Sequence, residues 1–167
     1  MKKRIVLLSL LLLLSITLFA GNEVKLGSVT NSINDIEVIV YDTKRVSLEF
    51  EFWKSIGMSF EEVAKLDATL SEVSKLIAIS EGTDIIYKER LDRVRINRGY
   101  ISIWITFVSS VERDIIRILI EDDHGYGGAY GFVMTTDELR DFRTLLQGVE
   151  TEYEGMQTEL RKFKNRD

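Results

Sequence analysis

The clearest pattern in this chain is an alternation of apolar and polar residues between positions 36 and 52. A period of two, with one apolar and one polar face, is typical of antiparallel strands packed on one side. The polar residues 42–45 separate two such runs and predict a turn. A short edge strand is expected before them, at Val24–Ser28. The apolar positions of the two runs are Ile36, Val38, Val40, Val46, Leu48, Phe50 and Phe52.

The period then changes to that of a helix. Ser59 is followed three residues later by Glu62, the capping-box pattern that satisfies the first free amides of a helix. Apolar residues then recur every three or four positions, which predicts an amphipathic helix ending near Glu81 and Gly82. Its apolar positions are Val63, Leu66, Leu70, Val73 and Ile77.

A second block of strands is expected after this helix. The expected strands are 84–96 (one long strand or a bulged pair), 100–108, 114–121 and 129–134. The segment 114–121 is apolar on both faces, which predicts a central position in the sheet. Thr135 and Glu138 then repeat the capping signature, and the helical apolar phase behind them runs from Leu139 to Phe163.

The two helix starts superpose at an offset of 76 residues, so that Ser59 corresponds to Thr135 and Glu62 to Glu138. This suggests two copies of a strands-then-helix unit, at 24–81 and 84–156, with the first copy short of one strand. The alternative is that any two capped amphipathic helices share this spacing, because helical geometry enforces it. Both interpretations predict an antiparallel α+β fold, a curved sheet with two helices covering one face.

The first twenty residues have the three zones of a secretory signal peptide. Residues 2–4 are basic, residues 5–19 are an apolar run, and Ala20 is a small cleavage-site residue. The run of 15 residues is shorter than the roughly 20 that span a bilayer. We therefore expect cleavage after residue 20, a single domain at 21–167, and a periplasmic or extracellular location. The alternative is an uncleaved anchor.

Composition narrows the classes of function. The chain has no cysteine, so disulfides and thiolate metal sites are excluded. Removing residues 1–20 takes away three basic and no acidic residues, which leaves 19 basic and 27 acidic residues, a net charge of −8. Such a surface repels phosphate backbones at long range, which disfavours nucleic acid as a partner.

The segment Gly131–Leu139 (GFVMTTDEL) resembles the strand-to-helix junction of the Whirly and transcriptional-coactivator-like single-stranded-DNA-binding fold. The resemblance covers residues 84–156 and implies a unit of four antiparallel strands followed by one helix. Members of that fold bind single strands through basic and aromatic residues on the sheet, inside cells or organelles. An acidic chain with an export signal departs from both conditions, so the resemblance implies topology and not activity.

A basic and aromatic stretch is the main candidate for ligand binding. Cationic groups beside aromatic platforms are what single-stranded nucleic acids need, and they suit equally an anionic lipid head, a glycan or an acidic protein. The alternative is a solvated sheet face with cross-strand ion pairs. The residues are Lys88, Arg90, Arg93, Arg95 and Arg98, interrupted by Glu89 and Asp92, with Tyr100 and Trp104 on the non-core face of the next strand.

The stretch 121–131 contains the only histidine, three carboxylates and four glycines. Asp122, Asp123 and His124 are weak metal candidates, because loop carboxylates suit Ca²⁺ and a histidine with an aspartate suits Zn²⁺. Their spacing matches no EF-hand and one histidine is too few for zinc, so a hairpin turn without metal or cofactor is favoured. Tyr126 and Tyr130 could add an aromatic contact surface.

The long helical phase from Leu139 to Phe163 fits a heptad seam, which would join two copies into a homodimer. The alternative is one helix packed on its own sheet and fraying after Glu154.

Catalysis finds little support, because the chain has no nucleophile-elbow or phosphate-loop motif and one histidine for any triad. We therefore expect an exported, non-enzymatic binding or interaction module of unknown protein or polyanionic ligand. The alternatives are an exported nucleic-acid or polyanion binder and a carboxylate-based hydrolase near His124. The expected ligand-binding residues are Arg93, Arg95, Tyr100, Trp104, Tyr126 and Tyr130.

Overall fold

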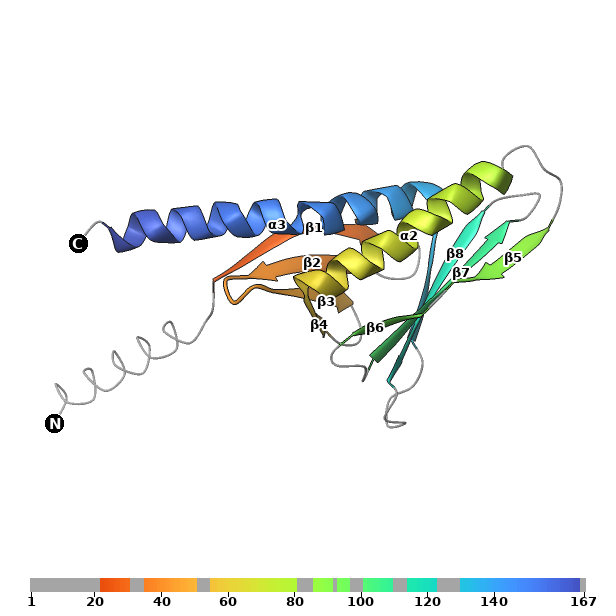
Figure 1. The fold of residues 1–167 in the computed structure, drawn as a ribbon, viewed down its shortest axis with the longest axis horizontal. Helices are drawn as coiled ribbons and strands as arrows, with labels where there is room; N and C mark the ends of the chain where they lie inside the picture. Colours follow the sequence, from red (N-terminus) through yellow and green to blue (C-terminus); the bar gives the residue numbers. More distant parts are fainter. Residues whose placement is uncertain are drawn as a thin grey trace, which may run out of the picture.

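Over the residues that it describes, a computed structural model of the chain has two helices and two antiparallel sheets (Figure 1), which confirms the predicted α+β class. The structure describes residues 22–30, 35–50, 55–80, 86–91, 93–96, 101–109, 114–122 and 130–165. The predicted signal peptide lies outside the described residues, as do Phe52 and the turn at 97–99.

The first half of the chain forms one sheet and the first helix. Its elements are β1 (Glu23–Thr30), β2 (Asp35–Tyr41), β3 (Arg45–Phe50), β4 (Ser55–Ser59) and α2 (Phe60–Ser80). β4 corrects the expectation that this unit is short of a strand. Ile56 and Met58 are buried and alternate with the half-buried Gly57, but five residues with a central glycine give only a weak period-two signal.

The second half repeats this order of elements. They are β5 (Tyr87–Arg90), β6 (Val94–Ile96), β7 (Ile101–Ser109), β8 (Ile115–Asp122), β9 (Tyr130–Met134) and α3 (Thr136–Lys164). The segment expected as one strand or a bulged pair is the interrupted pair β5 and β6, and both strands pair with β7. α3 continues well past Glu154, where fraying was one alternative, and its last turn contains Arg161, Lys162 and Lys164.

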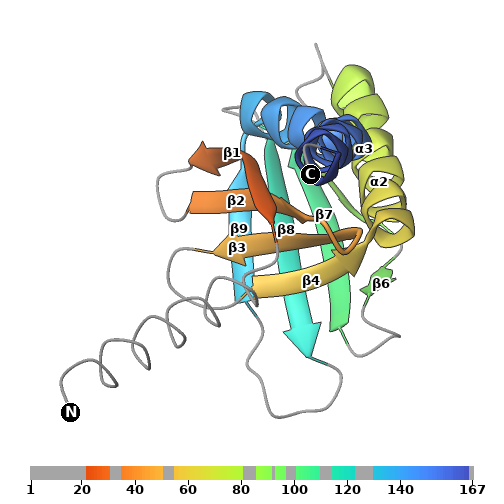
Figure 2. The ribbon, with the colours of Figure 1, turned by 90° about the vertical axis from the view of Figure 1, so that its left-hand side faces the viewer.

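The strands form two sheets where the sequence predicted one. The first sheet has the order β1-β2-β3-β4, and the second has β5-β7-β8-β9 with β6 also on β7. Strands of the two sheets cross one another (Figure 2). The inner faces share a core, in which the rings of Phe50 and Phe132 lie 5.6 Å apart. The strands therefore form two separate hydrogen-bonded sheets, but the two sheets share one hydrophobic core.

Each helix packs against the first strands of the other half. α2 contacts β6 and β7 of the second sheet and, less extensively, β3 and β4 of its own half. α3 contacts β1 and β2 of the first sheet and, less extensively, β8 and β9 of its own half. At one of these contacts Gly27 lies close to Leu145 of α3, and a Cβ there would come within 2.9 Å of Leu145 Cδ2, so that the leucine side chain would have to shift. Such reciprocal packing is what an approximate twofold axis between two halves produces. Neither half covers its own sheet alone.

The helices begin as the capping signatures predicted. The Glu62 backbone N–H donates to Ser59 Oγ at 3.2 Å, and the Ser59 N–H donates to Glu62 Oε2 at 2.7 Å. Thr135 and Glu138 make the same reciprocal pair. The buried positions of the two helices also correspond at the offset of 76. They are Val63, Leu66, Leu70 and Val73 in α2, and Leu139, Phe142, Leu146 and Val149 in α3.

An ion pair joins the two helices at equivalent positions. Arg143 Nε donates to Asp67 Oδ1 at 2.8 Å, and both side chains are only 21% exposed. The two residues are 76 positions apart, the same offset that relates the helix starts. Two equivalent residues touch each other only where an approximate twofold axis passes between them. The Asp67–Arg143 pair therefore marks that axis. Within the described segments, neither helix combines the length and apolar character needed to cross a membrane.

Candidate functional site

The outward face of the second sheet collects basic and aromatic side chains. Directly paired residues of antiparallel strands share a face, and Ile103, Ile105 and Phe107 of β7 point into the core. The side chains on the opposite face form what we call the basic sheet face. They are Lys88, Arg90, Arg95, Trp104, Thr106, Val108, Ile115, Arg117, Leu119, Glu121 and Val133, with Gly131 among them.

The strand register arranges these side chains in rows across the sheet. One row is Arg90–Thr106–Arg117–Val133, and the next is Trp104–Leu119–Gly131. A third row pairs Arg95 with Ser102 and Glu121. An apolar strip that ends at an exposed glycine therefore lies between two rows containing arginines.

Trp104 is the centre of a cluster that fixes this surface. The Arg90 guanidinium carbon lies 3.6 Å from the centroid of the indole ring, and that of Arg93 lies 5.4 Å away. The indole Nε1–H donates to Glu121 Oε2 at 2.6 Å. Cation–π contacts and a charge-assisted hydrogen bond restrict the ring to one orientation. The surface is therefore ordered before a ligand arrives.

Several predicted binding residues come together on this face. Arg93, Arg95 and Trp104 lie on it or beside it, and both arginines are exposed. Arg117 was missed by sequence reasoning. It lies opposite Thr106 in the row that contains Arg90. Its alternation with Ile116 and Ile118 was visible in the sequence, but the pairing of β8 with β7 was needed to place it.

The remaining predicted residues belong to the segments 97–100 and 122–130. Tyr100, Asp123, His124 and Tyr126 lie outside the described residues. Asp122 and Tyr130 belong to strands β8 and β9, but their side chains are outside the description as well. Elsewhere in the described part of the chain, no group of three histidine or acidic side chains is arranged to hold a metal ion.

The corresponding face of the first sheet is acidic. Its described charged side chains are Glu23, Lys25, Asp35, Glu37, Arg45 and Glu49, four acidic and two basic. The basic sheet face has four basic side chains and one acidic among those described. The pKa of Tyr41 on the acidic face is raised, first by desolvation and then by the negative charges of Glu49 and Glu23.

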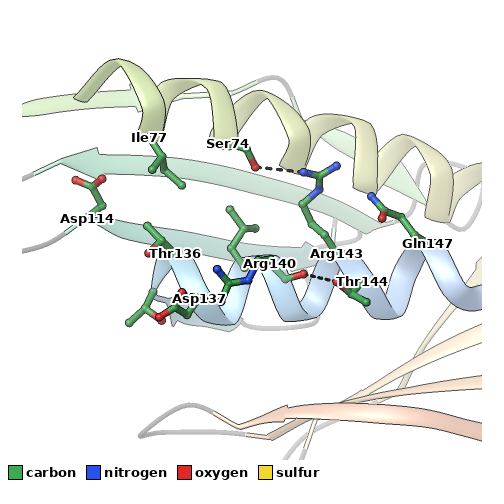
Figure 3. A pocket seen from close by; sticks show the side chains of 11 residues that line it. Ser74, Ile77, Asp114, Thr136, Asp137, Arg140, Arg143, Thr144 and Gln147 are labelled. Atoms are coloured by element: carbon green, nitrogen blue, oxygen red, sulfur yellow. Dashed lines mark hydrogen bonds and ion pairs between the residues drawn. The ribbon is translucent and has the colours of Figure 1, made fainter. Parts of the chain in front are cut away.

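A groove of about 670 Å³ lies between the helices near the start of α3 (Figure 3). Ser74 and Ile77 of α2 face Arg140, Arg143 and Gln147 of α3 across it. Arg143 is held by Asp67 and by Ser74, whose Oγ accepts from Nη1 at 3.2 Å. Arg140 makes an exposed pair with Asp137. We call this site the polar groove.

The apolar positions of the predicted dimer seam are largely occupied within the protomer. Leu139, Phe142, Leu146 and Val149 are buried in the core, as is Met156 farther along the helix. Beyond Met156, Leu160 packs partly on the core and Phe163 is 65% exposed.

Comparison with known sequences adds no assignment to these sites. No protein-family model matches the chain, and no curated protein matches it either.

Proposed function

We propose that this protein is an exported, non-enzymatic binding module that takes an anionic ligand on the basic sheet face. The observation that carries the proposal is the contrast between two corresponding surfaces of one molecule. A mature chain with a net charge of −8 gathers four basic side chains and one tryptophan on one sheet, whereas the other sheet is acidic. A local positive surface on an acidic protein attracts anions at short range.

The arrangement of Trp104 favours recognition of charge over stacking of bases. The ring face that a base would use is covered by the protein's own Arg90 at 3.6 Å. Single-stranded nucleic acid would have to displace this arginine before stacking on the ring. A linear polyanion without bases, such as a sulfated or carboxylated glycan, needs only the guanidinium and ammonium groups. We therefore take an anionic glycan as the ligand class.

The test measures the affinity of the mature protein for heparin. A single-stranded oligothymidylate of similar charge is measured in parallel and represents the nucleic-acid alternative. We expect heparin to bind with an affinity that falls as salt rises, because exposed charge pairs are screened. In Arg95→Ala/Arg117→Ala, the loss of two exposed cations should weaken binding by about tenfold, or about 1.4 kcal/mol.

The matched control is Lys25→Ala/Arg45→Ala on the acidic face, which changes the net charge by the same amount. Its affinity for heparin should stay within about twofold of the parent. Equal losses in the two variants would show that only net charge matters and would reject the site. Tighter binding of the oligothymidylate than of heparin would instead favour the nucleic-acid alternative, and binding of neither would overturn the proposal.

A further inference from the structure

The polar groove has a counterpart on the other side of the Asp67–Arg143 pair. This second groove, of about 400 Å³, lies between the start of α2 and the middle of α3. Its lining corresponds to that of the polar groove at the offset of 76. Phe60, Val63, Ala64, Ala68 and Ser71 correspond to Thr136, Leu139, Arg140, Thr144 and Gln147, and Glu150 corresponds to Ser74. We call it the apolar groove after Phe60, Val63 and the two alanines, and its lining also includes Asp67, Arg143, Gln147 and Glu150.

The two grooves differ in chemistry at most of these positions. In the apolar groove, alanines stand where the polar groove has Arg140 and Thr144. The apolar groove is also partly filled, because the rings of Phe60 and Tyr153 meet edge to face at 5.3 Å. The position that corresponds to Tyr153 is the smaller Ile77. The two helices therefore pack at these positions with alanine and phenylalanine in the apolar groove. The polar side chains at the corresponding positions of the polar groove are not needed for helix packing.

The polar groove contains two carboxylates, of Asp114 and Asp137, and the two guanidinium groups of Arg140 and Arg143. Asp137 is paired with Arg140 at 2.9 Å, and Asp114 accepts a hydrogen bond from Ser80 Oγ at 3.1 Å. Asp114 lies at one end, and Arg143 and Gln147 lie toward the other (Figure 3). Arg143 is fixed by its bonds to Asp67 and Ser74, which orients the guanidinium before any ligand arrives. Arg140 is 71% exposed, and its pair with Asp137 is of the surface kind that contributes little to stability. It can exchange that partner for a ligand carboxylate.

From this arrangement we propose that the polar groove binds a small zwitterion, with its carboxylate at Arg140 and Arg143 and its amino group at Asp114 and Asp137. The groove volume falls in the range of about 300–1,000 Å³ that small-molecule sites occupy. The proposal rests on side chains and not on the amides at the start of α3, because Thr135 and Glu138 already cap that end. It is independent of the basic sheet face.

The test is calorimetric titration of the mature protein with the dipeptide alanyl-alanine, with acetate, ethylamine and glucose as single-feature controls. Alanyl-alanine should bind saturably and raise the melting temperature, because a ligand that binds only the folded state stabilises it. Each of the three controls should bind at least about tenfold more weakly, since each lacks one or both charged ends.

The decisive variant is Thr136→Phe/Arg140→Ala/Thr144→Ala, which gives the polar groove the residues of the apolar groove. It should abolish alanyl-alanine binding and leave heparin binding unchanged. Arg140→Ala alone, at an exposed side chain that carries no fold risk, should weaken dipeptide binding by about tenfold or more. Arg161→Ala, the same charge loss at an exposed site near the end of α3, should have no effect.

Two results would overturn the proposal. One is absence of saturable dipeptide binding by the parent, and the other is equal affinity in the parent and in Arg140→Ala. Acetate binding as tight as dipeptide binding would reduce the groove to a simple anion site and reject the zwitterion. Loss of heparin binding with intact dipeptide binding would remove the proposed function and leave this inference standing.

Discussion

The two halves of this molecule share an inner pattern and differ in their outer surfaces. Following the strand register from β4 and β9, Trp104 and Leu119 of the second sheet stand where the first sheet has Glu37 and Glu49. Positions that face the core are apolar in both halves. The comparison teaches that burial restricts only the core-facing positions to apolar residues. The outward positions of one half can therefore serve as a control for the corresponding positions of the other.

The largest expected effect on stability comes from truncating buried leucines at corresponding positions of the two helices. Leu70 and Leu146 are 76 residues apart, and their exposed fractions are 0% and 3%. We expect Leu70→Ala and Leu146→Ala each to lower the free energy of unfolding by about 2–5 kcal/mol, because each leaves a cavity in the shared core. Denaturant unfolding should show one transition in both variants.

Thr151→Ala, at an exposed position of α3, is the control and should stay within about 0.5 kcal/mol of the parent. Two transitions, of which each leucine variant shifts only one, would show that the halves unfold separately. The packing of each helix on the sheet of the other half would then contribute little to the free energy of unfolding.

A smaller effect is expected at the axis. Asp67→Ala or Arg143→Ala should cost about 1–3 kcal/mol, because each leaves a partly buried charge without its partner. The exchange Asp67→Arg/Arg143→Asp should recover at least half of that loss in thermal unfolding, because the two positions are equivalent. No recovery would show that the surroundings of the two residues, and not their pairing across the axis, set the energy.

The smallest effect concerns Tyr41 of the acidic face, whose position in the register corresponds to Val108 of the basic sheet face. Desolvation and the charges of Glu49 and Glu23 raise the pKa of Tyr41 above its ordinary value of 10.0. A raised folded-state pKa stabilises the fold below pH 10 relative to higher pH, and stability is lost as the pH rises through the folded value. In Tyr41→Phe this part of the alkaline loss should disappear from melting curves. An unchanged profile would contradict the influence of the acidic face on Tyr41.

Most elements of the fold could be predicted because their signals are local. Capping boxes at Ser59 and Thr135 fixed both helix starts, and the period-two spacing of Ile36, Val38 and Val40 fixed the core-facing side of β2. β4 was missed because five residues around Gly57 give almost no periodic signal. Of the basic sheet face and its surroundings, Arg93, Arg95 and Trp104 were predicted from the run of basic residues at 88–98 and from the non-core face of the next strand. Arg117 was not, because it belongs to a strand whose neighbour was unknown.

The amino-acid sequence by itself determined which residues face the core and where the helices begin, since both follow from spacing and capping within a few residues. Whether the two units share a common origin stays a prediction. Only the tertiary structure decided that the strands divide into two sheets and that each helix covers the other half. It also decided that Asp67 meets Arg143 and that one register aligns Arg90 with Arg117. These features depend on contacts between distant segments, and a register shift of one residue would turn every side chain to the other face.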